Sequence, residues 1–224
     1  GPGNAGRLDQ NAGTISTANG SWIFLGTDGA NGTYNLADSS ASGGTLTGMA
    51  QGTGSATCGD MYVGVGGYPW AANTNPANRG VGTLRLNTTG SLAATGLVNI
   101  ARNGAGTMLI DSGTFSCNEL WIGQGASATG ITSISGGAIV TNNWTIIGRE
   151  SGNGTLNMTG GTLTKNGGGR FIVADNATGA MNMSAGTVSV NDEFWVGQGG
   201  SSNGIVTQSG GTISCNSWVA IGRD

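Results

Sequence analysis

The chain has 224 residues, among them 46 glycines, only 8% charged residues and no histidine. Collagen would need glycine at every third position, and a disordered chain would have few apolar residues, whereas 37% of these positions are hydrophobic. Without histidine there is no Ser-His-Asp or Cys-His catalytic machinery and no His-ligated zinc. The composition therefore indicates a folded chain that lacks the residues of much common enzymology.

The charge of the chain also narrows the range of partners. The net charge is −3, and the 8 basic residues are scattered singly along the sequence. A phosphate backbone needs clustered Lys and Arg, and a membrane span needs roughly 20 consecutive apolar residues. The sequence has neither, so we expect neither a nucleic acid nor a membrane as a partner.

An internal repeat predicts the fold. The string GTLNMTGGTLT at Gly154 recurs, with variations, at Gly82, Gly106, Gly130, Gly179 and Gly204. Each repeat alternates apolar and polar residues in three short segments, with Gly or Asn between them. Three such strands cannot bury their apolar side alone, so successive repeats must stack, each strand parallel to the next. The sequence predicts an all-β, right-handed parallel β-helix (solenoid) of about eight coils, each with 24–25 residues and three short strands.

In chain order, we expect an N-terminal segment or cap at residues 1–12 and a partial first coil at 13–31. The second coil is irregular, with strands at 34–36, 45–47 and 61–63, an insertion within 37–60 and an inserted loop at 67–81. Six regular coils follow. Residues 1–224 are thus predicted to form a single β-helix domain.

The three cysteines follow the repeat. Cys58, Cys117 and Cys215 fall at an inward position of the second strand, in coils two, four and eight. Their Cα atoms should lie at least roughly 9.6 Å apart, which is beyond disulfide reach. We predict three free, buried thiols, and the same distances argue against a metal site built on them.

Aromatic residues gather at the outward positions of the third strand, because these positions alternate with the inward aliphatic residue. One column holds Phe24, Tyr62, Trp121 and Trp195, and the other holds Trp22, Trp144 and Trp218 with Asp60, Glu119 and Glu193. A large exposed aromatic patch usually marks a binding surface, although aromatic residues also stack along sheets for stability alone.

A glycan suits this predicted surface. Trp121 and Trp195 should lie roughly 14 Å apart, so that both rings could contact one extended sugar chain. Carboxylates and amides beside them could hydrogen-bond to sugar hydroxyls, and the inserted loop could form a wall or lid. The candidate carbohydrate-binding residues are Tyr62, Tyr68, Trp70, Trp121, Trp195, Asp60, Glu119, Glu193, Gln124 and Gln198.

A second outward array lies on the middle strand. It consists of Thr14 and Ser16, Thr45 and Thr47, Thr114 and Ser116, Thr162 and Thr164, Thr187 and Ser189, and Thr212 and Ser214. A flat Thr-x-Thr grid resembles the ice-binding face of β-solenoid antifreeze proteins. Threonine is also a favoured strand residue, so a structural explanation is available.

Catalysis is not favoured by the placement of the carboxylates. A glycosidase needs two carboxyl groups roughly 5.5 Å apart for retention or 6.5 to 9.5 Å apart for inversion. Glu119 and Glu193 should be roughly 14 Å apart, while Asp60 and Glu119, at roughly 9.6 Å, are marginal. We therefore predict no catalytic residue, no cofactor and no metal site.

The repeat GTLNMTGGTLT and the segment FWVGQGG resemble the repeats of β-helical regions in large secreted bacterial proteins. Together with the exposed aromatic residues, the chain resembles the β-helical carbohydrate-binding modules of family 89, which are attached to xylanases. This resemblance covers coils two to eight. It implies non-catalytic binding of xylan or a related plant cell-wall polysaccharide, a covalently linked catalytic domain, and a secreted or cell-surface bacterial protein.

The last coil ends directly after a strand, without a polar cap, which indicates either end-to-end dimerisation or excision from a longer protein, and we favour excision. Two alternative functions remain open. One is a structural or adhesive β-helical repeat of a secreted bacterial protein. The other is a polysaccharide-degrading enzyme similar to the pectin lyases.

Overall fold

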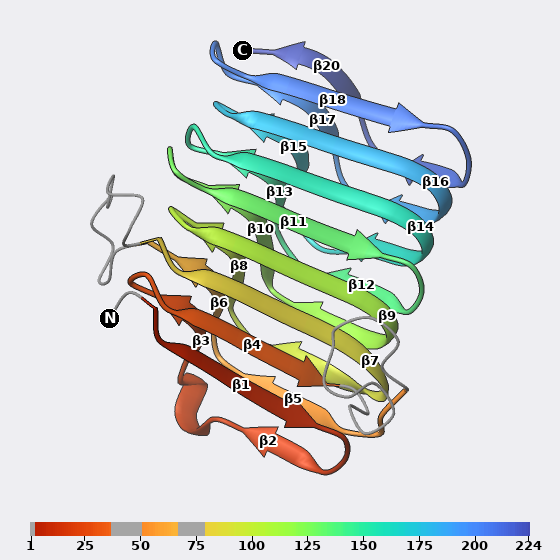
Figure 1. Ribbon diagram of the computed structural model, residues 1–224. Helices are drawn as coiled ribbons and strands as arrows, with labels where there is room; N and C mark the ends of the chain where they lie inside the picture. The colour runs from red at the N-terminus through yellow and green to blue at the C-terminus, as the bar shows by residue number, and fades with distance from the viewer. Residues whose placement is uncertain (1–2, 37–50, 67–78) are drawn as a thin grey trace.

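The computed structural model describes residues 3–36, 51–66 and 79–224. Their strands wind into a solenoid of two facing sheets (Figure 1). The front sheet has 12 strands and the rear sheet has 8 within these residues. The first strand of each coil runs from left to right across the front in Figure 1, and the strands of the rear sheet run back behind it while the chain climbs, so the coil is right-handed. The predicted right-handed parallel β-helix is confirmed.

The described strands form eight coils. Coils one and two contain β1 (Ala5–Gln10), β2 (Thr14–Ser16), β3 (Ile23–Thr27), β4 (Asn31–Leu36), β5 (Ser55–Cys58) and β6 (Met61–Val65). Coils three to five contain β7 (Val81–Ala94), β8 (Leu97–Arg102), β9 (Ala105–Cys117), β10 (Glu119–Gln124), β11 (Thr129–Ile134), β12 (Ala138–Thr141) and β13 (Thr145–Arg149). Coils six to eight contain β14 (Asn153–Lys165), β15 (Phe171–Asp175), β16 (Thr178–Val190), β17 (Phe194–Gln198), β18 (Asn203–Gln208), β19 (Thr212–Cys215) and β20 (Val219–Arg223). A single 3₁₀ turn is described, η1 (Ala18–Gly20).

The first two predicted strands of a coil are continuous in half of the coils. In coils three, four, six and seven they merge into the long strands β7, β9, β14 and β16. The pairing of β14 with β16 shifts register after Met158, where the strand bends. The corner between the first two segments is thus a β-bulge in these coils, which bends the strand without ending it.

The first two coils differ from expectation. Residues 5–10, expected as an N-terminal segment or cap, form β1, which pairs in parallel with β4 and completes the first coil. The second strand of coil two is β5, which pairs with β2 and β7, so the prediction of 45–47 for that place was wrong. Both segments alternate hydroxyl-bearing and apolar residues, so their local patterns are equivalent. Residues 45–47 themselves, and most of the loop at 67–81, lie outside the described residues.

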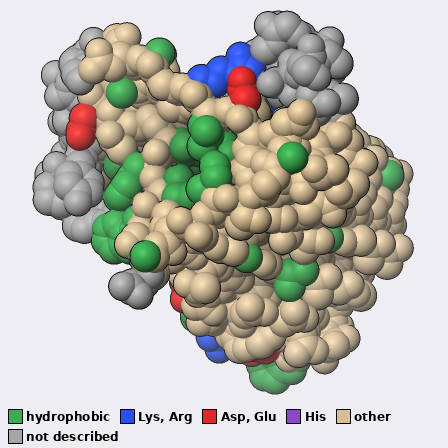
Figure 2. Space-filling model, turned by 90° about the horizontal axis from the view of Figure 1, so that it is seen from below, with side chains coloured by type: hydrophobic (Ala, Val, Ile, Leu, Met, Phe, Trp, Pro, Cys, Tyr) green, Lys and Arg blue, Asp and Glu red, His purple; other side chains and the backbone are tan. Residues whose placement is uncertain are grey.

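The interior is built from columns of like residues, as the stacking of coils requires. The parallel registers align the third-strand residues Leu25, Val63, Ile100, Ile122, Ile147, Val173, Val196 and Ile221. Most of these side chains are fully buried. Seen from the end that carries the first coil, hydrophobic side chains gather in the middle of the surface (Figure 2). One continuous apolar core therefore fills the rod.

The cysteines occupy the predicted inward column and are free. Cys58 and Cys117 are buried, whereas Cys215, in the last coil, is partly exposed. The same column contains an unexpected charge, because Lys165 pairs with Val190 of the next coil and is 0% exposed. Its ammonium group donates hydrogen bonds to the carbonyl oxygens of Gly167 and Gly168, both at 2.8 Å, and to that of Gly169. Burial lowers the pKa of this ammonium, and nearby Asp192 opposes the shift.

Candidate functional site

The outer face of the rear sheet carries the predicted aromatic column. The strand registers align Phe24, Tyr62, Asn99, Trp121, Ile146, Ile172, Trp195 and Ala220. These side chains point outward as expected, but two of the aromatic rings are much less exposed to solvent than expected. Tyr62 is only 3% exposed and Trp195 only 4%. The prediction that both rings lie open to solvent is therefore wrong.

Neighbouring side chains cover these two rings. The Phe24 ring stacks on Tyr62 with centroids 5.3 Å apart, and the Trp22 ring lies 5.8 Å from Tyr62. Over Trp195 lie the guanidinium groups of Arg223 and Arg170, at 3.9 and 4.6 Å from the ring centroid. Paired strands are roughly 4.8 Å apart, so long side chains from adjacent coils can reach over a ring. The alternation of residues within one coil predicts which way a ring points, but it does not predict whether side chains of other coils cover it.

A residue with left-handed backbone conformation in each coil turns the side chain that follows it outward, which produces another column of outward residues. Gly123 has φ +76°, and a Cβ atom there would lie 2.0 Å from the carbonyl oxygen of Asn153. This conformation interrupts the strict alternation of the strand, so the next residue, Gln124, points outward. The same position in successive coils holds Arg102, Gln124, Arg149, Asp175, Gln198 and Arg223. A row of charged and amide groups thus borders the aromatic column.

Between these columns the surface is hollowed, with a volume of about 370 Å³. The lining residues come from four successive coils and are Glu119, Trp121, Trp144, Ile146, Arg149, Asp175 and Gln198. Two indole rings and an isoleucine supply apolar surface, while two carboxylates, a guanidinium and an amide supply polar groups. The Arg149 guanidinium lies 3.9 Å from the centroid of the Trp121 ring and 3.6 Å from Asp175 Oδ2.

Three lining residues have buried polar atoms without a hydrogen-bond partner among the described residues. Two are donors that face a carboxylate beyond ordinary hydrogen-bond geometry, Trp121 Nε1 beside Glu119 and Arg149 Nε at 3.6 Å from Asp175 Oδ2. The third, Gln198 Oε1, is an acceptor. Burial raises the pKa of the Glu119 carboxyl, and Arg149 and the indole N–H of Trp121 offset part of this rise. Buried polar groups without a hydrogen bond are uncommon, so the hollow offers a bound molecule one unpaired acceptor and two donors whose contacts within the protein are not of ordinary geometry.

Other predicted site residues are occupied by contacts within the protein. Gln124 is 5% exposed; it accepts a hydrogen bond from Asn99 Nδ2 at 2.6 Å and donates one to Glu150 Oε2 at 2.8 Å. Asp60 Oδ1 accepts from the backbone N–H of Leu97 at 2.8 Å. These two residues support the strands around the hollow.

Glu193 and Tyr62 also lie outside the hollow. Glu193 Oε2 accepts from Trp195 Nε1 at 2.7 Å and lies 3.3 Å from Arg223 Nη1. Burial and the neighbouring Asp60 raise the pKa of the Tyr62 phenol to about 12. The predicted residues Tyr68 and Trp70 lie outside the described part of the chain. Of the ten candidates, the structure brings Glu119, Trp121 and Gln198 together.

The hollow also contains residues that were not among the candidates, namely Trp144, Ile146, Arg149 and Asp175. Trp144 was expected in the outward column but not in the site. Arg149 and Asp175 follow the left-handed position of their own coils, as Gln198 does. Both residues could have been identified from the sequence by aligning, in every coil, the residue that follows the left-handed position.

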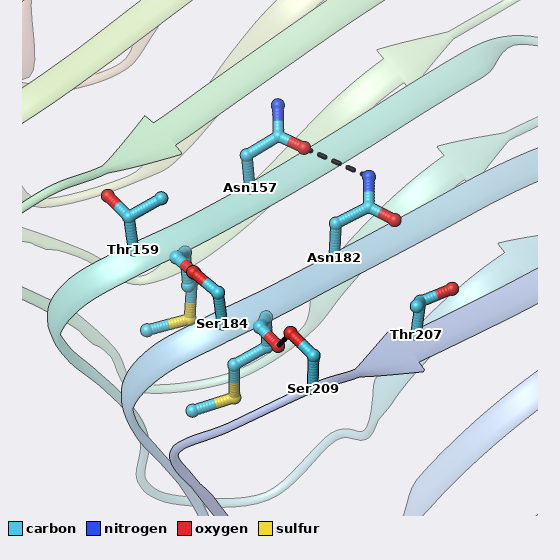
Figure 3. A pocket seen from close by; sticks show the side chains of 8 residues that line it. Asn157, Thr159, Asn182, Ser184, Thr207 and Ser209 are labelled. Carbon is cyan, nitrogen blue, oxygen red and sulfur yellow. Dashed lines mark hydrogen bonds between the residues drawn. The ribbon is translucent and has the colours of Figure 1, made fainter.

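A second hollow, of about 300 Å³, lies on the outer face of the front sheet (Figure 3). Side chains of β14, β16 and β18, and Ser209 directly after β18, line it. They are Asn157, Thr159, Asn182, Ser184, Thr207 and Ser209, with Met158 and Met183. Asn182 Nδ2 donates to Asn157 Oδ1 at 3.0 Å, so the two amides bond to each other. This hollow has neither an aromatic ring nor a charged group, and it offers less to a ligand than the aromatic hollow does.

In the described part of the chain, no three His, Cys, Asp or Glu side chains are arranged to hold a metal ion. None of its helical segments is long and apolar enough to cross a membrane. Comparison of the chain with protein-family models, with curated proteins and with solved structures finds no match.

Proposed function

We propose that the protein is a non-catalytic carbohydrate-binding module whose ligand occupies the aromatic hollow on the rear sheet. The observation that carries this proposal is the combination of two indole rings with polar groups that lack hydrogen bonds of ordinary length within the protein, namely the acceptor Gln198 Oε1 and the donors of Trp121 and Arg149, which face carboxylates. Sugars match this combination, because a pyranose ring has apolar C–H faces and its hydroxyls both donate and accept hydrogen bonds.

The choice of glycan rests on the resemblance to family 89 modules. That resemblance favours xylan, a plant cell-wall polysaccharide, and a covalently linked catalytic domain in a secreted or cell-surface bacterial protein. The hollow itself supports a neutral, hydroxyl-rich ligand. Its carboxylates Glu119 and Asp175 outnumber its one cation, Arg149, so a strongly anionic glycan would be disfavoured.

Affinity electrophoresis in gels that contain xylan, glucan or pectin tests the proposal. The wild-type protein should be retarded by xylan, and Trp144→Ala should lower the affinity at least about tenfold, because the aromatic contact alone contributes on the order of 1 kcal/mol. Trp144→Phe, which keeps a ring, should retain most of the retardation. Thr187→Ala, on the front sheet, is the matched control and should migrate as the wild type does.

Two results would contradict the proposal. Absence of retardation by every glycan would favour the structural or adhesive repeat. New reducing ends or unsaturated products in the gel would indicate a polysaccharide-degrading enzyme.

A further inference from the structure

A set of five residues on the outer face of the rear sheet, four of which line the hollow, occurs a second time at a fixed offset. We define unit one as Glu119, Trp121, Gln124, Trp144 and Arg149, and unit two as Glu193, Trp195, Gln198, Trp218 and Arg223. Each residue of unit two lies 74 positions after its counterpart. This offset equals three coils, so equivalent residues occupy the same columns about 14 Å apart along the rod.

The two units share their local geometry as well as their sequence. The Arg149 guanidinium lies 3.9 Å from the Trp121 ring centroid, and the Arg223 guanidinium lies 3.9 Å from that of Trp195. In each unit the second tryptophan, Trp144 or Trp218, belongs to the following coil. Trp218 is 73% exposed.

Arg170 joins the two units. Its guanidinium carbon lies 5.5 Å from the Trp144 ring of unit one and 4.6 Å from the Trp195 ring of unit two. It also approaches Glu193 of unit two, at 3.5 Å. Rings and guanidinium groups thus continue from one unit to the next along the axis of the rod.

We propose that the two units bind one extended glycan chain that runs along this axis. The inference rests on the proposed function and specifies its ligand as a long, linear polysaccharide. A chain held at one unit is presented to the other at an effective concentration on the order of millimolar, which can tighten binding about 10²-fold or more. An oligosaccharide shorter than about 14 Å can occupy only one unit at a time.

Isothermal titration with a ladder of linear xylo-oligosaccharides and with soluble xylan tests this proposal. Short oligosaccharides should bind wild-type protein at two sites, one at each unit, and affinity should rise steeply once the chain can span both units. Trp144→Ala and Trp218→Ala, substitutions at equivalent positions, should each reduce the stoichiometry for short ligands to one. Each should also remove the steep rise with length and lower the affinity for xylan about 10²-fold.

Thr212→Ala, on the front sheet of the last coil, is the control and should leave both measurements unchanged. If Trp144→Ala does not fold, the equivalent pair Arg149→Ala and Arg223→Ala replaces it. A wild-type stoichiometry of one, or loss of binding in only one variant of a pair, would overturn the two-unit proposal while leaving glycan binding intact. Absence of binding by any oligosaccharide or xylan would overturn the proposed function itself.

Discussion

The outer faces of the two sheets have the same stacked register but opposite chemistry. Along the front sheet, Thr162, Thr187 and Thr212 align in one row and Thr164, Ser189 and Ser214 in another. Serines and threonines from most of the other coils continue these rows, with Ser55 and Thr57 of β5 in coil two. The rear sheet carries tryptophans, arginines and carboxylates instead. The comparison teaches that the apolar core is built by the inward residues, which leaves many outward positions on each face free to acquire a function.

The largest effect should come from the left-handed position that shapes the rear face. Gly123→Val should lower the free energy of unfolding by at least about 3 kcal/mol, because a β-branched residue at positive φ is strained and its Cβ would meet a backbone oxygen. Gly123→Ala adds the same Cβ without β-branching, and Ala101 and Ala174 show that an equivalent position can hold a Cβ at positive φ, so Ala should cost less than Val but at least about 1–2 kcal/mol.

Chemical denaturation measures both variants. Gly200→Val is the control, because Gly200 is exposed, has an ordinary φ, and a Cβ atom added there would have no other atom within 4 Å. Its free energy of unfolding should stay within about 0.5 kcal/mol of the wild-type value. Equal costs at positions 123 and 200 would show that the left-handed residue does not matter to the rear sheet.

A smaller effect is expected at the corner where the two faces meet. Lys165→Met should lower the free energy of unfolding by about 1–3 kcal/mol, because the carbonyl oxygens of Gly167, Gly168 and Gly169 lose their common donor. Thermal or chemical denaturation measures the change, and Asn166→Ala, at the adjacent exposed position, is the control. A variant more stable than wild type would mean that burying the ammonium costs more than its hydrogen bonds contribute.

The rear face also contains an ionisable group whose burial should make stability depend on pH. The pKa of the Glu119 carboxyl is raised from 4.5 in the folded protein. Its contribution to the free energy of unfolding is therefore present below about pH 4.5 and is lost as the pH rises through the raised pKa. Glu119→Gln should remove this dependence, and its stability relative to wild type should increase from about pH 4 to about pH 7. Denaturation at both pH values measures this, with Glu150→Gln, an exposed carboxylate, as the control. An identical pH profile for wild type and Glu119→Gln would contradict the prediction.

The smallest effect should come from the second hollow, on the front sheet. Asn182→Ala removes one amide of the Asn157–Asn182 hydrogen bond, which is exposed to solvent, and should change stability by less than about 1 kcal/mol. Retardation by xylan should not change. Loss of glycan binding in this variant would break the comparison, because it would place a ligand on the front sheet.

Much of the fold, and part of the site, could be predicted from the sequence. The glycines that recur every 24 or 25 residues locate the coils, and the columns of aliphatic residues follow from strand alternation. The second strand of coil two was assigned wrongly because two segments have equivalent patterns. The direction of Trp121 and Trp195 was correct, but the burial of Trp195 depends on arginines from two other coils.

The sequence by itself therefore determined the stacking, since no single coil can bury its apolar residues and only a repeat in register can do so. It also determined which columns face outward. Only the tertiary structure decided which outward residues stay accessible and which are covered, because long side chains from coils distant in sequence meet across the sheet. For that reason Trp121, Arg149 and Gln198, from three different coils, lie around one hollow.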